Sequence, residues 1–191
     1  YLESKGVERP GGDFFKCDVK TIKSAILALR NRLEIEDNRV FDFNMRPEQE
    51  AAVNKTFNYF KNKKRLKKDD SLKFLWNAKM RFGKTFASYQ LAKRMNWKRV
   101  LVLTFLPAVQ SAWEEDLKLH IDFKDWQFIS KDGMQYKEIN KKKPFVCFGS
   151  FQDFLGKNKS GKIKNKNEWA HEINWDCIIL DEYHFGSWTE R

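Results

Sequence analysis

Three short runs constrain the fold of this 191-residue chain more than any other feature, because they are apolar almost throughout. They are "RVLVLTF" at 99–105, "KPFVCFGS" at 143–150 and "DCIILD" at 176–181. Strands without apolar–polar alternation are typical of parallel sheets that are buried on both faces. Helix-like segments at 84–95 and 107–119 flank the first run. The pattern therefore predicts an α/β domain in which helices cover a mainly parallel sheet.

A further strand and a further helix are expected earlier in the chain. The stretch "LKFLWNA" at 72–78 is strand-like. Pro47 suits the first position of a helix, in which Val53, Phe57 and Phe60 then recur at helical spacing. The lysine-rich stretch between them is expected to be a solvated loop.

The first 36 residues are predicted to be an extension, or the tail of an upstream domain. "DFFKCDV" at 13–19 is expected to be a short strand, and Asp18 to cap a helix. The apolar face predicted for that helix consists of Ile22, Ala25, Ile26, Leu29 and Leu33. The acidic "EIEDN" at 34–38 is interpreted as a linker, so the main domain is predicted over 40–191.

The overall charge favours a polyanionic partner. The chain has 37 Lys and Arg against 26 Asp and Glu, a net charge of +11. Nucleic acid is the first candidate, and a basic surface kept for solubility is the alternative. The lysine-rich stretches 61–68, 141–143 and 157–166 are expected to strengthen that binding, although a solvated loop is the alternative for each.

The three cysteines, Cys17, Cys147 and Cys177, are far apart, and the last two lie in apolar runs. This spacing argues against a disulfide framework or a zinc site and predicts a reducing, cytoplasmic setting. No apolar run approaches the length of a membrane span, so no membrane partner is expected.

A phosphate-binding loop is predicted at "AKMRFGKT", 78–85, between the expected strand and a helix. Ala78 stands where the pattern usually has its first glycine. Gly83 would let the backbone approach phosphate closely, Lys84 would reach the β- and γ-phosphates, and Thr85 would offer its hydroxyl to Mg²⁺. The intervening residues that would surround the phosphates are Lys79, Met80, Arg81 and Phe82.

An acidic pair supplies the other half of such a site. In "IILDEYH", an apolar run ends in Asp181 and Glu182, and the carboxyl ends of parallel strands line the ligand crevice. Asp181 would hold Mg²⁺ through a water, and Glu182 would orient and deprotonate the attacking water. The alternative is an acidic pair that merely ends a strand at the surface.

These motifs resemble those of superfamily 2 helicases and translocases. Residues 181–184 read as DExH, their motif II, and "AKMRFGKT" matches motif I. "FNMRPEQEAAV" resembles the segment upstream of motif I, "VLVLTFLPAVQSAWEEDL" resembles motif Ia, and "FVCFGSFQDF" resembles a later backbone-contacting motif. The resemblance covers about residues 40–191 and implies the first RecA-like lobe, a three-layer P-loop domain that hydrolyses ATP with Mg²⁺.

The resemblance also implies roles for single residues. Gln49 would read the adenine edge, with Arg46 beside it in the nucleotide site; an ordinary helix-surface glutamine is the alternative. His184 would couple the ATP state to the nucleic-acid state, unless it is merely a satisfied polar residue. For Ser150 and Gln152, the resemblance implies a nucleic-acid phosphate contact, and helix capping is an equal alternative. The residues implied in nucleic-acid contact are Pro107, Ser111, Ser150 and Gln152.

Within the superfamily, the chain looks most like the motor parts of bacterial restriction-type DNA enzymes, so DNA is favoured over RNA. Motif III and the second lobe do not occur in these residues, so we expect a fragment of a motor whose second RecA-like lobe belongs to the same polypeptide. Nuclease or modification subunits are candidate partners. Residues 6–26 resemble the tail of some GIY-YIG nuclease domains, although a simple extension is an equal alternative.

Three rival functions stay open at this point. A DExH-group RNA helicase has similar motifs, because backbone contacts dominate binding to both nucleic acids. A nucleic-acid-binding module with a non-hydrolytic nucleotide site would tolerate the loss of Glu182. A phosphate-loop kinase is disfavoured, because kinases rarely carry DExH or motif Ia.

Overall fold

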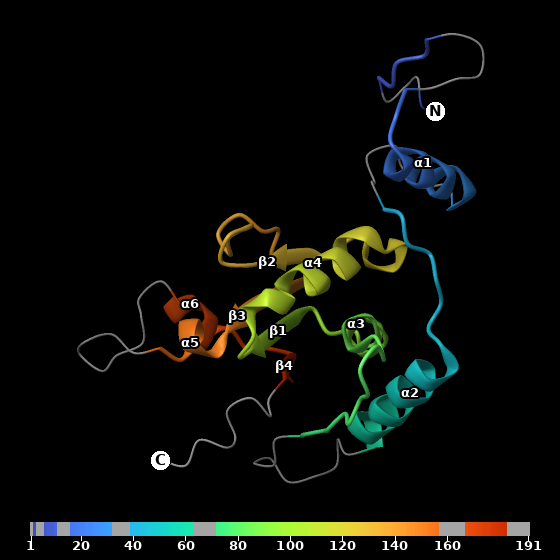
Figure 1. Cartoon of the computed structure of the whole chain (residues 1–191). Coiled ribbons are helices and arrows are strands. Elements are labelled where there is room, and N and C mark those ends of the chain that lie inside the picture. Colours follow the sequence, from blue (N-terminus) through green and yellow to red (C-terminus); the bar gives the residue numbers. More distant parts are fainter. Residues whose placement is uncertain are drawn as a thin grey trace.

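The domain is built on a sheet of four parallel strands. The computed structural model describes residues 2, 6–10, 16–31, 39–62, 72–156 and 167–182. The strands lie in the order β2-β3-β1-β4 (Figure 1). Their bounds are β1 (Arg99–Thr104), β2 (Gln127–Ile129), β3 (Phe145–Ser150) and β4 (Cys177–Asp181). Thr104 lies opposite both Ser150 and Asp181, so three carboxyl ends meet at one edge. The predicted parallel sheet is confirmed.

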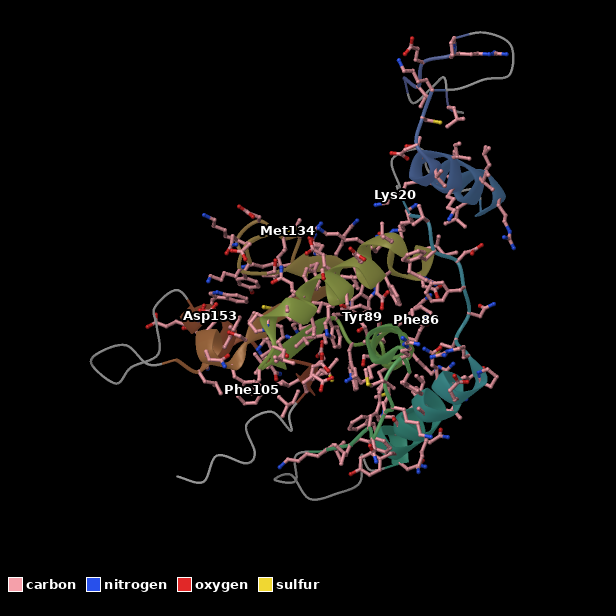
Figure 2. The ribbon with its side chains drawn as sticks, viewed as in Figure 1. Lys20, Phe86, Tyr89, Phe105, Met134 and Asp153 are labelled. Carbon is pink, nitrogen blue, oxygen red and sulfur yellow. The ribbon has the colours of Figure 1, made fainter. Side chains whose placement is uncertain are left out.

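Helices cover both faces of this sheet, which gives the predicted three layers (Figure 1). One face packs against α3 (Lys84–Met95) and α4 (Gln110–Leu119), and the other against α5 (Phe151–Phe154) and α6 (Glu168–Glu172). Phe86 and Tyr89 bury their rings on the first face (Figure 2). The core cluster on that face also includes Trp113 and Leu117 of α4 and Val100, Val102, Val146 and Phe148 of the sheet.

The helix α2 (Pro47–Asn62) begins at the predicted proline and packs against α3. Val53 on α2 is fully buried beside Ala87 and Leu91 of α3. The predicted helix at 107–119 is also present, as the 3-10 turn Pro107–Val109 followed by α4.

The expected strand at 72–78 is wrong, because residues 72–79 form no strand. Their aromatic side chains find partners on α2 instead. Phe74 packs against the ring of Tyr59, and the Trp76 indole N–H donates to Thr56 Oγ1 at 2.7 Å. Leu75, which lies between them, is 87% exposed. The phosphate-loop motif therefore follows a segment without regular secondary structure that packs on α2.

The strand β4 is not buried on both faces as its apolar sequence predicts. Ile178 is 54% exposed and Leu180 is 46% exposed, because β4 ends the described sheet. The short strand β2 and the short helices α5 and α6 were not predicted, since each has only three to five residues and little periodicity.

The N-terminal helix α1 (Val19–Asn31) lies apart from the sheet (Figure 1). Asp18 caps it as predicted, because its Oδ1 accepts the Thr21 N–H at 2.7 Å. The predicted apolar face is wrong in part: Ile22, Ile26 and Leu29 are exposed. The buried side chains are Ser24, Ala25, Leu27 and Ala28. Residues 16–18 are not a strand, and 13–15 and Leu33 lie outside the described residues.

The segment that follows from Arg39 is tied to the C-terminal end of α4. The Arg39 guanidinium donates to the carbonyl oxygens of Leu117 and His120, both at 2.6 Å. Carbonyls at a helix C-terminus favour a cation, so this contact fixes the approach to α2. The division into 1–36 and 40–191 stays a prediction.

Cys147 is buried, and burial raises the pKa of its thiol to about 12, so it packs as a small apolar residue. Cys17, Cys147 and Cys177 are all free thiols. Among the described helices, none combines the length and apolarity that crossing a bilayer requires.

Candidate functional site

The predicted phosphate loop leads directly into α3. Gly83 has a φ of 78°, and no side chain caps the helix start. Lys84 and Thr85 are the first two helical residues. The backbone N–H groups of an uncapped first turn lack partners within the helix, and together with the helix dipole they favour an anion. The geometry suits a phosphate group.

The side chains of Arg46 and Gln49 donate hydrogen bonds to carbonyl oxygens of this loop. Arg46 Nη2 donates to Arg81 O at 2.9 Å and to Phe82 O at 2.5 Å. Gln49 Nε2 donates to Phe82 O at 2.8 Å, while Gln49 Oε1 accepts the Arg46 N–H at 2.8 Å. The two side chains therefore fix the loop carbonyls on the side of α2.

Gly83 is required for this arrangement. A Cβ at position 83 would lie 2.5 Å from Gln49 Nε2, closer than real Cβ contacts come. Its positive φ is also unfavourable for residues other than glycine. The close approach expected between Gly83 and a phosphate is thus made, in this structure, between Gly83 and the Gln49 amide.

Gln49 is only 5% exposed, so it is not an ordinary surface glutamine. Its amide is engaged by the loop, and its adenine role stays a prediction. A cleft of about 550 Å³ lies between α2 and residues 74–82, and Gln49 is not among the residues that line it. Its lining includes Arg46, Lys55, Trp76, Lys79 and Met80 but neither Lys84 nor the acidic pair. The cleft therefore lies on the α2 side of the loop.

The structure brings Lys84 together with Asp181, the last residue of β4, and with Glu182, which follows the strand. Lys84 Nζ lies 2.5 Å from Glu182 Oε1 and 3.5 Å from Asp181 Oδ1. Partial burial alone lowers the pKa of Lys84, but the Glu182 hydrogen bond and both carboxylate charges raise it above its ordinary value. Glu182 has a φ of 52°, a strained conformation of the kind that clusters at functional sites.

The residues present fit a hydrated Mg²⁺. Mg²⁺ keeps several waters and typically takes one or two carboxylates together with substrate phosphates. Asp181 and Thr85 supply one carboxylate and one hydroxyl beside the expected phosphate position. The described part of the chain has no group of three or more His, Cys, Asp or Glu that could hold a metal alone. Any Mg²⁺ here would therefore depend on phosphate and water ligands.

Sequence reasoning missed one residue of this site, Trp113 on α4. Its indole Nε1–H donates to Asp181 Oδ2 at 3.0 Å. The spacing of Trp113 and Leu117 predicts only that both face the core. No sequence signal links Trp113 to a carboxylate 68 residues later.

The segments implied in nucleic-acid contact lie side by side at the carboxyl edge of the sheet. Phe105 and Phe151 stack with ring centroids 4.3 Å apart, and this contact joins the end of β1 to the start of α5. Pro107 and Ser111 are exposed. They are thus accessible at the edge where the acidic pair also lies.

Ser150 and Gln152 differ from each other. Ser150 Oγ accepts the Asp153 N–H at 3.1 Å and so caps α5. Gln152 is exposed. The capping interpretation of Ser150 therefore has direct support, and Gln152 stays a candidate contact. His184 lies outside the described residues.

The lysine stretch 141–143 lies at the opposite, amino edge of the sheet. It borders a cleft of about 300 Å³ with Lys98, Arg99 and Asp176, which precede or open β1 and β4. Lys143 Nζ lies 3.3 Å from Asp125 Oδ1. This position favours a solvated loop for 141–143. Residues 63–68 and 157–166 lie outside the described residues.

Comparison with known proteins agrees with these motifs. Residues 42–189 match the family described as "Type III restriction enzyme, res subunit". The chain is also 36% identical, over 154 residues, to a protein of Mycoplasma pneumoniae whose name describes the C-terminus of a type II restriction enzyme and methyltransferase. That alignment covers 76% of this chain and 20% of the relative, so the chain spans about a fifth of the relative's length. No solved structure matches the chain. With its parallel α/β sheet and superfamily 2 motifs, the chain belongs to the helicase-like family of the restriction res subunit.

Proposed function

We propose that this chain is the ATP-binding lobe of a DNA-dependent ATPase in a restriction system. The convergence of Lys84, Asp181 and Glu182 at the start of α3 carries the proposal. Residues 84 and 181 are far apart in sequence, and their meeting at a helix N-terminus suits triphosphate binding and hydrolysis.

In this proposal, ATP changes the partner of Lys84. In this structure, Lys84 pairs with Glu182 at 2.5 Å. The β- and γ-phosphates would attract the Lys84 ammonium and release the Glu182 carboxylate. Glu182 would then orient a water and accept its proton. The uncapped first turn of α3 would bind phosphate oxygens through backbone N–H groups.

Mg²⁺ beside Thr85 and Asp181 would neutralise phosphate charge. Arg46 and Gln49 would keep the loop carbonyls turned toward α2, so that the loop N–H groups face the nucleotide. For Gln49 to read adenine, its bond to Phe82 O would have to break. The cleft of about 550 Å³ between α2 and residues 74–82 has room for a base, and the Gln49 side chain would have to turn to reach it.

The DNA contacts proposed lie at the carboxyl edge of the sheet, at Pro107, Ser111 and Gln152. DNA is favoured over RNA because the relative's name describes a restriction enzyme. A second RecA-like lobe of the same polypeptide would complete the site, with His184 coupling the two ligands. Nuclease or modification partners and a cytoplasmic location follow from the same restriction role.

Glu182→Gln in the full-length protein tests this proposal. The change keeps the size and hydrogen bonding of the side chain but removes the base. We expect ATP binding to persist and turnover to fall about 10²–10⁴-fold. Lys93→Ala is the control, since Lys93 lies in the last turn of α3, away from the site, and pairs with Asp122. Unchanged turnover in Glu182→Gln would show that Glu182 is not the base. Nucleotide binding without any turnover in the wild-type protein would instead favour a nucleic-acid-binding module in which the nucleotide is structural.

A further inference from the structure

Trp113 links the two helices and the strand that surround the candidate ATP site. The Tyr89 hydroxyl, on α3, donates to the Trp113 carbonyl oxygen at 2.7 Å. The Tyr89 and Trp113 rings also meet edge to face, with centroids 5.4 Å apart. The Trp113 indole N–H then donates to Asp181 Oδ2. Because Lys84 opens α3 and lies 3.5 Å from Asp181 Oδ1, these contacts form a closed ring.

The two oxygens of Asp181 therefore have different neighbours. Oδ2 accepts from the indole of a residue that is only 2% exposed, and Oδ1 is the oxygen near Lys84. The Asp181 side chain is itself 10% exposed. A nearly buried carboxylate needs a donor, and a donor fixed by core packing also fixes the plane of the carboxylate.

Packing leaves Trp113 little freedom to move. Its ring lies in the core cluster with Phe86, Val102 and Phe148, and its backbone is held by Tyr89. Residues that orient a metal-binding carboxylate work best when their own rotamers are locked in this way.

We propose that Trp113 is a positioning residue for Asp181: its indole N–H holds Oδ2, so that Oδ1 faces the phosphate loop and Mg²⁺. The inference rests on the proposed function. The positioning role differs from a purely structural role, in which Trp113 would only fill the core and its N–H would bond to Asp181 without affecting Mg²⁺.

The test uses Trp113→Phe in the full-length protein, which removes the N–H and keeps an aromatic ring. Binding of a fluorescent, non-hydrolysable ATP analogue is measured while Mg²⁺ is titrated. We expect the Mg²⁺ midpoint to rise about 10–100-fold, the usual effect of losing a partner that orients a metal ligand. Nucleotide binding in EDTA should stay unchanged.

Two controls separate positioning from packing. Trp126→Phe changes another tryptophan that packs against the same core, beside Phe123, and should leave the Mg²⁺ midpoint unchanged. In an Asp181→Asn background, Trp113→Phe should have no further effect on the midpoint, since the interaction is already lost. If Trp113→Phe does not fold, 3-benzothienylalanine at position 113 keeps both rings and removes only the N–H.

A wild-type Mg²⁺ midpoint in a folded Trp113 variant would overturn the inference, even if the variant were less stable. Additive effects with Asp181→Asn would overturn it as well. Failure of the proposed function is distinguishable, because the wild-type protein itself would then show no Mg²⁺-dependent nucleotide binding, and the inference would fall with it.

Discussion

Replacing Gly83 with alanine should destabilise the protein through two separable effects. The first is backbone strain, because position 83 has a φ of 78°. A left-handed conformation costs a residue with a Cβ about 1–2 kcal/mol. The second is displacement of Gln49, whose Nε2 would lie 2.5 Å from the new Cβ. Leaving that buried amide without its hydrogen bond to Phe82 O costs about 1–3 kcal/mol. The expected total is about 2–5 kcal/mol.

A double-mutant cycle with Gln49→Ala isolates the second effect. In the Gln49→Ala background the amide is absent, so Gly83→Ala should cost only the strain, about 1–2 kcal/mol. The assay is urea unfolding of the four proteins, followed by the combined fluorescence of the seven tryptophans. Equal costs of Gly83→Ala in both backgrounds would refute the close approach of Gln49 to the loop.

Two further predictions concern charge. Burial, aided by the charge of Glu115, raises the pKa of Asp116 to about 6. Its ionisation thus opposes folding above pH 6, and the penalty disappears as the pH falls toward 4. Asp116→Asn should stabilise the protein at pH 7.5 by about 1 kcal/mol, given its partial exposure, and thermal melts should show no gain near pH 4. Changing lysines 141–143 to glutamine should leave DNA affinity and its salt dependence nearly unchanged in anisotropy titrations, because these lysines lie at the amino edge of the sheet. A salt slope smaller by about 0.9 per lysine would instead show that DNA binds at that edge.

The sequence predicts those parts of the fold that depend on local patterns. The apolar runs at 99–105, 143–150 and 176–181 became β1, β3 and β4, and α3 begins and ends where its sequence indicates. The prediction of a strand at 72–78 is wrong because the apolar pattern does not specify whether these residues pair with a sheet or pack on a helix. Phe74 and Trp76 would suit a strand, but they pack against α2 in this structure.

The candidate site was predictable in its parts and less so in its contacts. The motif patterns identify Lys84, Asp181 and Glu182, which the structure brings together. The bonds that hold the loop, from Arg46 and Gln49, join residues more than 30 positions apart. Such contacts, like that of Trp113 with Asp181, depend on side-chain geometry that no spacing rule contains.

The most direct test of the proposed function is phosphate release from ATP by the full-length protein, with and without double-stranded DNA. We predict that DNA stimulates wild-type turnover and that Lys84→Ala abolishes it while leaving the thermal unfolding transition nearly unchanged, since Lys84 is partly exposed and contributes little packing. The Lys93→Ala control on the same helix should retain DNA-stimulated turnover. Wild-type turnover in a folded Lys84→Ala protein would contradict the assignment of this loop as the ATP site.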